Sequence, residues 1–414
     1  MQKLPIATSI VRKLQDMGHT AYFAGGWVRD LIMDHPSDDI DIATSASVEE
    51  IQKIFPKTIP VGISFGIVVV VEKESLFEVA TFRKDLPYTD GRRPTGFKKT
   101  SAQEDALRRD FTINGMFYDP IDHKLYDYVE GQADIERKVI RAIGDPKLRF
   151  QEDRLRMMRA VRYATRFGFA IEEATKNAIL EEASSLLPAV AMERIWQEFK
   201  KMAQFSHFDE GLAELQRLKL LSVIFPELKN IPPAEIEHRL LCVENFPKEA
   251  PPIAELLELF PEKSIQAKLS IASYLKLPKE DKAFIQKLGY SFEMLTMPED
   301  WQANLEPVEW ARFYADPYSD LCLDIFAARL EATQKESFLR THSGRKKALF
   351  RFIERIKRKI FLVTSEDLFK EGIPKGPLMG KLLKEAERLS INFSLEEKDE
   401  LLSLLKNSSS WPSL

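Results

Sequence analysis

The fold is decided by the stretch Phe23-Ala24-Gly25-Gly26-Trp27-Val28-Arg29-Asp30-Leu31, followed by Asp38-Asp39-Ile40-Asp41-Ile42-Ala43-Thr44. Two glycines where a strand meets a helix let backbone N–H groups approach a triphosphate, and the N-terminus of the helix favours negative charge. Arg29, in the first turn of that helix, can donate to the same phosphates. A Gly-Gly pair alone is usually a tight turn, so the second half of the stretch must carry the argument.

That second half contains an Asp-Ile-Asp triplet. In a strand, residues i and i+2 point to the same side, so Asp39 and Asp41 project two carboxylates together while Ile40 and Ile42 face the core. Two carboxylates so close repel each other unless cations neutralise them, and Mg²⁺ prefers such ligands. A polar edge strand is the alternative, but the glycine turn a dozen residues upstream favours a site where two metal ions support phosphoryl transfer.

The segments around this stretch predict an α+β head. Strands are expected at 21–24, 67–71 and 76–80, with a hairpin turn at 72–75, and amphipathic helices at 8–17 and 48–55. Beyond Asp145 the strand signal fades and helix-forming composition continues to the end, interrupted by prolines. We therefore predict four parts, which are a head (1–140), a helical neck (141–205), a helical body (206–343) and a helical tail (344–414).

Composition describes a folded protein of several domains. The 414 residues are 44% hydrophobic and 30% charged, which predicts two to four domains. The N-terminal residues lack a continuous apolar run, and no segment approaches the roughly 20 apolar residues that cross a bilayer. The 2 cysteines cannot form a disulfide framework or a zinc site alone, and the 6 histidines form no metal-spaced cluster. These features predict a cytoplasmic protein without an appended His-Asp hydrolase domain.

Charge is concentrated in two segments. The chain has a net charge of −4, but residues 137–166 contain ten Lys and Arg against three Asp and Glu, and residues 345–359 contain eight against one. Each segment has a local charge of +7. Two solvated helix faces would explain this pattern, but basic segments in an acidic chain are also how a protein attracts a polyanion, and one of them adjoins the candidate site.

Four motifs in the order of one family make the sequence more specific. Residues 25–30 with 39–44 resemble motif A of the class II tRNA nucleotidyltransferase and bacterial poly(A) polymerase family. Residues 108–116 (Arg-Arg-Asp-Phe-Thr-Ile-Asn-Gly-Met) resemble its motif B, and residues 152–162 resemble its motif D. Residues 127–134 resemble motif C, with Glu130 where the family often has glycine.

The resemblance implies a polymerase-β-like head on a helical neck, body and tail. It also implies a template-independent enzyme that adds CCA to tRNA 3′ ends from CTP and ATP with two Mg²⁺ ions, or alternatively a poly(A) polymerase or an A-only tRNA enzyme. An inactive RNA-binding protein is disfavoured by the intact pair Asp39 and Asp41. Partners would be nucleoside triphosphates and the acceptor and TΨC arms of tRNA, with no membrane and no obligate protein partner. The implied nucleotide-binding residues are Gly26, Arg29, Arg109, Asn114, Asp153, Arg156, Arg159 and Arg162.

A third carboxylate is expected at a polymerase-type two-metal site. Glu78 is the candidate, because its strand could lie beside Asp39 and Asp41. Asp110 is the competitor.

Base selection without a template is the role expected of Asp153 and Arg156, which would be neighbours on one helix face. Cytosine and adenine present an amino donor beside a ring-nitrogen acceptor, whereas uracil and guanine present the reverse. A carboxylate only accepts and a guanidinium only donates, so the pair rewards C and A and leaves groups unpaired against U and G. An intrahelical ion pair is the alternative. Arg159 and Arg162 follow at three-residue steps and can serve the pocket wall or the phosphates.

Two further segments resemble family elements. Residues 83–94 are polar and rich in Gly and Pro, which predicts a mobile loop similar to the one that accompanies A addition in the family. Residues 372–381 open a helix whose free N–H groups could hold an RNA phosphate, and they resemble the tail element that grips tRNA. A well-capped helix after a loop is the alternative there.

Overall fold

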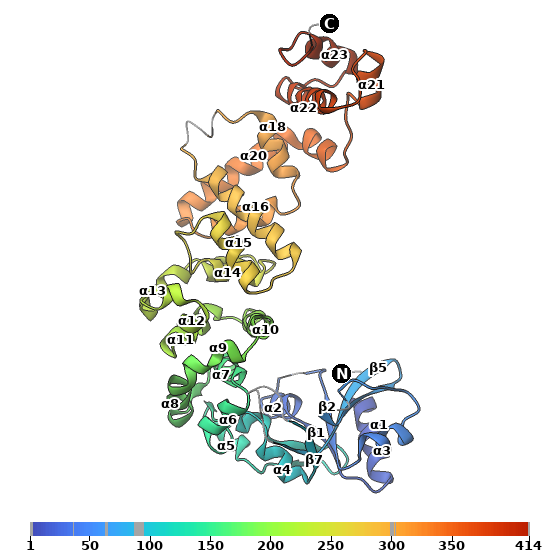
Figure 1. Ribbon diagram of the computed structural model, residues 1–414, viewed down its shortest axis with the longest axis vertical. Coiled ribbons are helices and arrows are strands. Elements are labelled where there is room, and N and C mark those ends of the chain that lie inside the picture. The colour runs from blue at the N-terminus through green and yellow to red at the C-terminus, as the bar shows by residue number, and fades with distance from the viewer. Residues whose placement is uncertain are drawn as a thin grey trace. The chain divides into compact units, whose positions relative to one another are not determined.

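The computed structural model describes residues 3–35, 37–62, 65–86, 95–298, 302 and 304–412. The chain divides into two compact units, residues 1–238 and residues 239–414, which are coloured blue to green and yellow to red in Figure 1. Within the described residues, no helix is both long enough and apolar enough to cross a bilayer. The division into head, neck, body and tail that the sequence predicts remains a proposal.

A mixed seven-stranded sheet forms the centre of the head. Its strand order is β3-β4-β5-β2-β1-β8-β9, and β2 runs parallel to β5 while the other neighbours described are antiparallel. The strands are β1 (Ala21–Ala24), β2 (Asp41–Thr44), β3 (Thr58–Ile59), β4 (Ile67–Glu72), β5 (Ser75–Thr81), β8 (Phe117–Asp119) and β9 (Lys124–Tyr126). Two short pairs complete the strands, namely β6 (Arg83–Asp85) with β7 (Phe97–Lys99) and β10 (Val139–Ile140) with β11 (Ala170–Ile171).

The two faces of this sheet are buried by different helices. Side chains alternate along each strand, so Phe23 and Ile42 enter one core while Ala24 and Ala43 enter another. Helices α1 (Lys3–Asp16) and α3 (Val48–Ile54) contribute to the first core, and α4 (Ala102–Leu107) contributes to the second. The second face is therefore the face on which Asp41 and Glu78, two residues before Ala43 and Ala80, are presented.

The remainder of the first unit is almost wholly helical. Most of the apolar side chains of α7, α10 and α11 are buried, so these helices pack together as an amphipathic group. The helices of this unit are α2 (Gly26–Ile32), α5 (Gly131–Glu136), α6 (Pro146–Glu152), α7 (Leu155–Phe167), α8 (Glu173–Glu182), α9 (Leu186–Ala189), α10 (Met192–Met202), α11 (Phe208–Arg217), α12 (Leu220–Ile224) and α13 (Pro233–Leu240), which reaches the boundary, with short 3₁₀ turns at Thr112–Asn114, Ala183–Ser185 and Pro226–Leu228.

The second unit is helical in all its described elements. One core gathers around Trp310, Tyr314 and Phe352, and a second gathers around Leu368, Leu382 and Leu401. Its helices are α14 (Pro252–Leu257), α15 (Ile265–Tyr274), α16 (Lys279–Leu295), α18 (Pro307–Ala315), α19 (Ser319–Ala327), α20 (Ala332–Lys357), α21 (Ser365–Lys370), α22 (Pro377–Asn392) and α23 (Lys398–Lys406), with a 3₁₀ turn at Val243–Asn245.

The predicted fold class, an α+β head followed by helices, is confirmed. The strands expected at 21–24, 67–71 and 76–80 are β1, β4 and β5, and the expected helices are α1 and α3. Two details were wrong. A short strand, β11, follows Asp145 because it pairs with β10, and residues 83–85 form β6 rather than loop because they pair with β7. Residues 87–94 of the expected mobile loop lie outside the described residues.

Candidate active site

One cavity of about 700 Å³ lies within the first unit, between the head sheet and α7 and α10. It brings together residues that are far apart in sequence, because the turn after β1, the start of β2, the segment after α4 and one face of α7 all border it. Every site residue predicted from the sequence lines it except Glu78. Those residues are Gly26, Arg29, Asp39, Asp41, Arg109, Asn114, Asp153, Arg156, Arg159 and Arg162.

The carboxylates gather where β2 begins. Strand β2 starts at Asp41, so Asp39 lies in the segment just before the strand rather than within it. Ile40 and Ile42 are buried in the head core as expected, with 4% and 1% of their surface exposed. Because β2 pairs in parallel with β5 at Ile42 and Val79, the preceding register position places Glu78 beside Asp41.

The electrostatics agree with this register. Desolvation, followed by the negative charges of Asp39 and Glu78, raises the pKa of Asp41 to about 6, against the opposing positive charge of Arg109. Three carboxylates therefore act on one another here, although Glu78 does not line the cavity. Its role as a third ligand stays a prediction that this coupling supports.

The donor set fits hard divalent cations. A bound cation would offset both the desolvation and the carboxylate repulsion that raise the pKa of Asp41. Across the described ranges, no group of three His, Cys, Asp or Glu side chains is arranged to hold a metal ion by itself. Mg²⁺ usually takes one or two carboxylates and completes its octahedron with water and substrate phosphates. The arrangement therefore suits ions that arrive with a nucleotide.

The competing carboxylate, Asp110, pairs with Arg159 and Asn114. It is 8% exposed and accepts hydrogen bonds from Nε and Nη2 of Arg159 at 2.8 and 2.5 Å and from the Asn114 amide at 3.1 Å. Burial alone would raise the pKa of Asp110, but the charges of Arg159 and Arg156 outweigh it and hold that pKa below its ordinary value. Asp110 therefore positions Arg159 and Asn114 in the cavity wall.

The glycine turn allows close approach of the chain to Arg109. Gly25 has φ +67°, which favours glycine, and a Cβ at this position would lie 3.0 Å from Nη1 of Arg109. Helix α2 begins at the next residue, Gly26, so its first N–H groups border the cavity. The turn and Arg109 together form a surface suited to phosphate oxygens.

Arg29 occupies a different position from the one expected of a free phosphate donor. It is 2% exposed, its Nε and Nη2 donate to Asp30 at 2.8 and 2.6 Å, and its Nη1 donates to the Asn114 side chain at 2.6 Å. Its guanidinium also lies 4.7 Å from the Phe167 ring and 5.3 Å from the Tyr163 ring. Phosphate binding by Arg29 stays a prediction, and the contacts show that it fixes Asn114.

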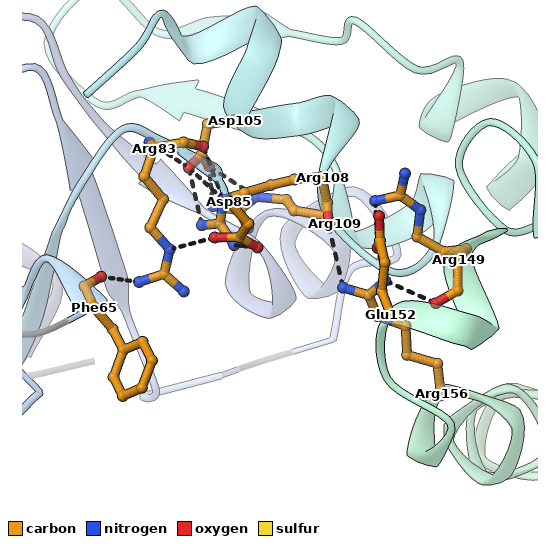
Figure 2. A network of polar contacts seen from close by, with 9 residues as sticks. All are labelled: Phe65, Arg83, Asp85, Asp105, Arg108, Arg109, Arg149, Glu152 and Arg156. Atoms are coloured by element: carbon orange, nitrogen blue, oxygen red, sulfur yellow. Dashed lines mark hydrogen bonds and ion pairs between the residues drawn. The ribbon is translucent and has the colours of Figure 1, made fainter. Parts of the chain in front are cut away.

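A buried carboxylate, Asp105, organises the basic residues after α4, as Figure 2 shows. It is 1% exposed and accepts from Arg109 at 3.2 and 3.1 Å, from Nε of Arg108 at 3.0 Å and from the backbone N–H of Arg83 at 3.0 Å. Burial would raise the pKa of Asp105, but Arg109 and Arg108 outweigh it and lower that pKa. Asp105 thus positions the Arg109 guanidinium at the cavity.

The same network reaches the expected base-selecting arginine. In Figure 2, Nη2 of Arg156 donates to the Arg108 carbonyl at 3.3 Å. Its Nη1 donates to the Arg149 carbonyl at 3.0 Å and to Glu152 at 2.6 Å. These contacts fix the guanidinium plane and leave the N–H of Nε and the second N–H of Nη2 as adjacent donors.

Asp153 and Arg156 do not share one helix face, and that expectation was wrong. The helix breaks at Asp153, whose backbone is extended (φ −146°, ψ 104°), so Asp153 lies at the joint between α6 and α7. Its Oδ1 accepts from the N–H of Leu155 at 3.1 Å and from Nη1 of Arg194 at 3.1 Å, and its Oδ2 accepts from Nη2 of Arg194 at 2.8 Å. Both residues nevertheless line the same cavity.

Some residues at the cavity were not found from the sequence. Tyr163 stacks on Arg162 at 4.2 Å, and Asp30 pairs with both Arg29 and Arg166. Arg194 comes from α10, beyond all four motifs. The only signal for Arg194 was its four-residue spacing from Glu198 in an amphipathic helix.

Motif C departs from the family at Glu130, and the structure shows the consequence. Glu130 has φ +61°, a left-handed conformation that glycine adopts without a side-chain penalty. The neighbouring carboxylate of Asp127 accepts from the N–H groups of Val129, Gly131 and Gln132, which holds the turn in place.

Comparisons with known proteins match this arrangement. The family model "Poly A polymerase head domain" matches residues 21–141, which contain the sheet and the carboxylates. The family model "Probable RNA and SrmB- binding site of polymerase A" matches residues 168–231, which contain α8 to α12.

Relatives and solved structures extend the match. The chain is 34% identical to the CCA-adding enzyme of Pediococcus pentosaceus over 408 residues, which are 98% of this chain and 97% of that protein. It is 45% identical to the CCA-adding enzyme of Bacillus cereus over 223 residues, 54% of this chain and 56% of that protein. The crystal structure of the Bacillus stearothermophilus CCA-adding enzyme in complex with CTP is similar, with a TM-score of 0.77 and 30% identity over 96% of this chain and 95% of that one.

Proposed function

The chain belongs to the family of CCA-adding enzymes, and on that premise we propose that it extends tRNA 3′ ends with C, C and A from CTP and ATP, releasing pyrophosphate. The observation that carries this proposal is one cavity that joins a carboxylate pair and a glycine turn to the side chains of Asp153 and Arg156. Phosphoryl transfer and base selection can therefore take place on a single bound nucleotide.

The phosphate side of the cavity would hold the triphosphate. The backbone N–H of Gly26, at the start of α2, and the guanidinium of Arg109 provide donors, and Asp105 keeps that guanidinium in place. Arg159 faces the same cavity from α7, with its guanidinium held by Asp110. Fixed donors of this kind cost no reorganisation when charge develops on the transferred phosphoryl group.

Asp39 and Asp41, supported by Glu78, would hold two Mg²⁺ ions. When bound, such ions lower the pKa of the attacking hydroxyl and neutralise the pyrophosphate leaving group. The protein's own contribution is to hold these carboxylates in a partly desolvated site, where burial and the charges of Asp39 and Glu78 raise the pKa of Asp41.

Base selection would follow from the unused hydrogen-bonding positions of two residues. An ionised carboxylate has about four acceptor positions, and three of those on Asp153 are used, which leaves one on Oδ2. Arg156 retains donors on Nε and Nη2. One acceptor and adjacent donors complement the amino group and ring nitrogen of cytosine and adenine, and they oppose uracil and guanine.

We propose that the second unit binds the acceptor and TΨC arms of tRNA. Lys347, Arg358 and Lys359 are exposed on and after α20, and no ion pair of Lys347 or Lys359 is found in the described residues. Helix α22 begins at Pro377 beside the exposed Lys375 and Lys381, so its first N–H groups could receive a phosphate. Phosphate contacts of this kind give affinity without sequence discrimination.

The test is addition of single labelled nucleotides to tRNA transcripts that end before CCA, after C and after CC, with a generic RNA alongside. The proposal expects C on the first two tRNAs, A on the third, and little extension of the generic RNA. A chain that only adds A to the CC-ending tRNA, or that extends the generic RNA with A, would instead be the A-only enzyme or the poly(A) polymerase.

A further inference from the structure

We propose that Arg194 is a specificity-determining positioning residue, which fixes the Asp153 carboxylate so that one acceptor position faces the incoming base. The inference rests on the proposed function and assigns a role to a residue outside the four motifs. Three observations support it, namely the ion pair between Arg194 and Asp153, the packing that holds α10 in place, and the break of the helix at Asp153.

The contact is a two-pronged ion pair across 41 residues of sequence. Nη1 and Nη2 of Arg194 donate to Oδ1 and Oδ2 of Asp153 at 3.1 and 2.8 Å. The two side chains are 25% and 18% exposed, and both residues line the cavity. A guanidinium that contacts both oxygens fixes the plane of a carboxylate as well as its charge, which an ammonium cannot do.

The packing of α10 keeps Arg194 opposite Asp153. Ile195, Trp196 and Phe199 are buried, which fixes the helix against its neighbours. One turn after Arg194, Glu198 accepts from Nε of Arg162 at 2.6 Å, with side chains only 7% and 3% exposed. Residues four apart lie on one helix face, so α10 presents two charged groups toward α7 and its N-terminal joint.

Because the helix breaks at Asp153, contacts from other residues must orient its carboxylate. Asp153 lies between α6 and α7 with an extended backbone, and its carbonyl accepts from the N–H of Arg156 at 3.0 Å. Its backbone is therefore held from the α7 side, whereas its carboxylate depends on side-chain contacts of its own. The contact with the N–H of Leu155 fixes Oδ1 only. Arg194 supplies the contact to Oδ2 and leaves that oxygen one further acceptor position.

Rejection of the wrong base requires that Oδ2 of Asp153 keeps its position. Uracil and guanine would place a carbonyl oxygen against Oδ2, and with a fixed carboxylate neither the carbonyl oxygen nor Oδ2 has a donor to accept from. A carboxylate that can rotate escapes this penalty, so removal of Arg194 should reduce discrimination more than it reduces correct addition.

The experiment compares single-turnover addition from CTP and from UTP to tRNA without CCA, and from ATP and GTP to tRNA ending in CC. For Arg194→Ala we expect the C:U and A:G ratios to fall at least about tenfold, with a smaller loss in the rate of correct addition. Arg194→Lys retains the charge but not the two-pronged contact, so its ratios should lie between those of the wild type and Ala. Unchanged ratios in Arg194→Ala would overturn the inference.

Two control variants separate positioning from helix docking and from charge. Glu198→Gln releases the second contact of α10 but leaves Asp153 paired, and Lys200→Ala removes a positive charge from the same helix outside the cavity. The inference expects near-normal ratios in Lys200→Ala and only a partial loss in Glu198→Gln, because Asp153 stays paired with Arg194 there. A loss in Glu198→Gln equal to that in Arg194→Ala would contradict it. If Arg194→Ala does not fold, the C:U and A:G ratios of Arg194→Gln and Arg194→Lys are compared with those of the wild type.

A wild-type protein that shows no preference for C over U would refute the proposed function rather than the role of Arg194.

Discussion

Two basic segments with the same local charge of +7 differ in how deeply their side chains are buried. In residues 137–166, Arg156 and Arg162 are 9% and 6% exposed and pair with Glu152 and Glu198, so their side chains build a pocket wall. In residues 345–359, Lys347 is exposed. The difference shows that charge density alone does not identify a pocket wall, whereas burial of the charged side chains does.

The physical consequence is a difference in sensitivity. Removing one partner of a buried ion pair leaves an uncompensated charge, which typically costs about 3–5 kcal/mol. An exposed pair contributes at most about 1 kcal/mol and is screened by salt. Single substitutions should therefore affect the cavity strongly, whereas several substitutions together are needed to affect the basic part of α20.

The largest effect should come from Asp41→Ala, on the cavity side of this comparison. Loss of a candidate metal ligand should reduce nucleotide addition by on the order of a thousandfold or more. Binding of tRNA and the thermal unfolding midpoint should change little, because Asp41 is presented to the cavity rather than packed in a core. Single-turnover rates and tRNA titrations decide this, and a loss of only a few-fold would remove Asp41 from the metal site.

Asp110→Asn tests the buried pairs of the first basic segment. The variant leaves Arg159 without its carboxylate, so the free energy of unfolding should fall by about 3 kcal/mol. Chemical denaturation measures this, with the exposed Asp122→Asn as the matched control. Equal stability of the two variants would mean that the ion pair between Asp110 and Arg159 contributes no more than an exposed one.

A pH effect is expected in the second unit, beneath the second basic segment. His342 is 3% exposed and hydrogen-bonds to the Tyr314 hydroxyl at 2.7 Å. Burial, followed by the charges of Arg345 and Lys346, lowers the pKa of His342 to about 4. Unfolded histidine titrates near pH 6.5, so between about pH 6.5 and pH 4 the unfolded chain binds the extra proton and stability falls as pH falls.

That loss should reach about 3 kcal/mol at the acid end of the window, where carboxylates also begin to titrate. The measurement is therefore the difference in thermal unfolding between the wild type and His342→Gln at several pH values. Stability of the wild type relative to the variant should decrease from pH 7 to pH 4.5. A difference that is independent of pH would show that His342 is protonated equally in both states.

The smallest effect per residue is expected on the exposed side of the comparison. Changing Lys347, Arg358 and Lys359 together to Ala should raise the KM for tRNA several-fold and reduce the slope of log affinity against log salt by up to about 3. Turnover at saturating tRNA should stay near normal. A control with three exposed basic residues outside α20, Lys248, Lys276 and Lys279, should retain the wild-type slope. Parallel slopes for both triple variants would exclude this surface from RNA binding.

The sequence predicted the parts of the site that local patterns encode. Strand alternation placed Ile40 and Ile42 in the core with the carboxylates on the other face, and the glycine turn before α2 borders the cavity as expected. Such features depend on neighbours only a few residues away, so residue spacing is enough to find them.

The long-range contacts could not be predicted in this way. The partner of Asp153 lies 41 residues away in α10, and no periodicity connects the two. Likewise, the side-chain types alone did not show that Asp110 pairs with Arg159, 49 residues away, instead of joining the carboxylate pair. The helix break at Asp153 was missed because Asp153 and Arg156 have helical spacing even though the backbone between them is not continuous helix.

The central claim is that protein side chains, without a template, select C and A in this cavity, and Asp153→Ala tests it most directly. Single-turnover addition from each of the four nucleoside triphosphates should be measured for the wild type and this variant on tRNAs ending before CCA and after CC. We predict that Asp153→Ala raises U relative to C, and G relative to A, by about tenfold or more, with tRNA affinity unchanged. A variant that adds nucleotides more slowly but retains the wild-type ratios would contradict the account.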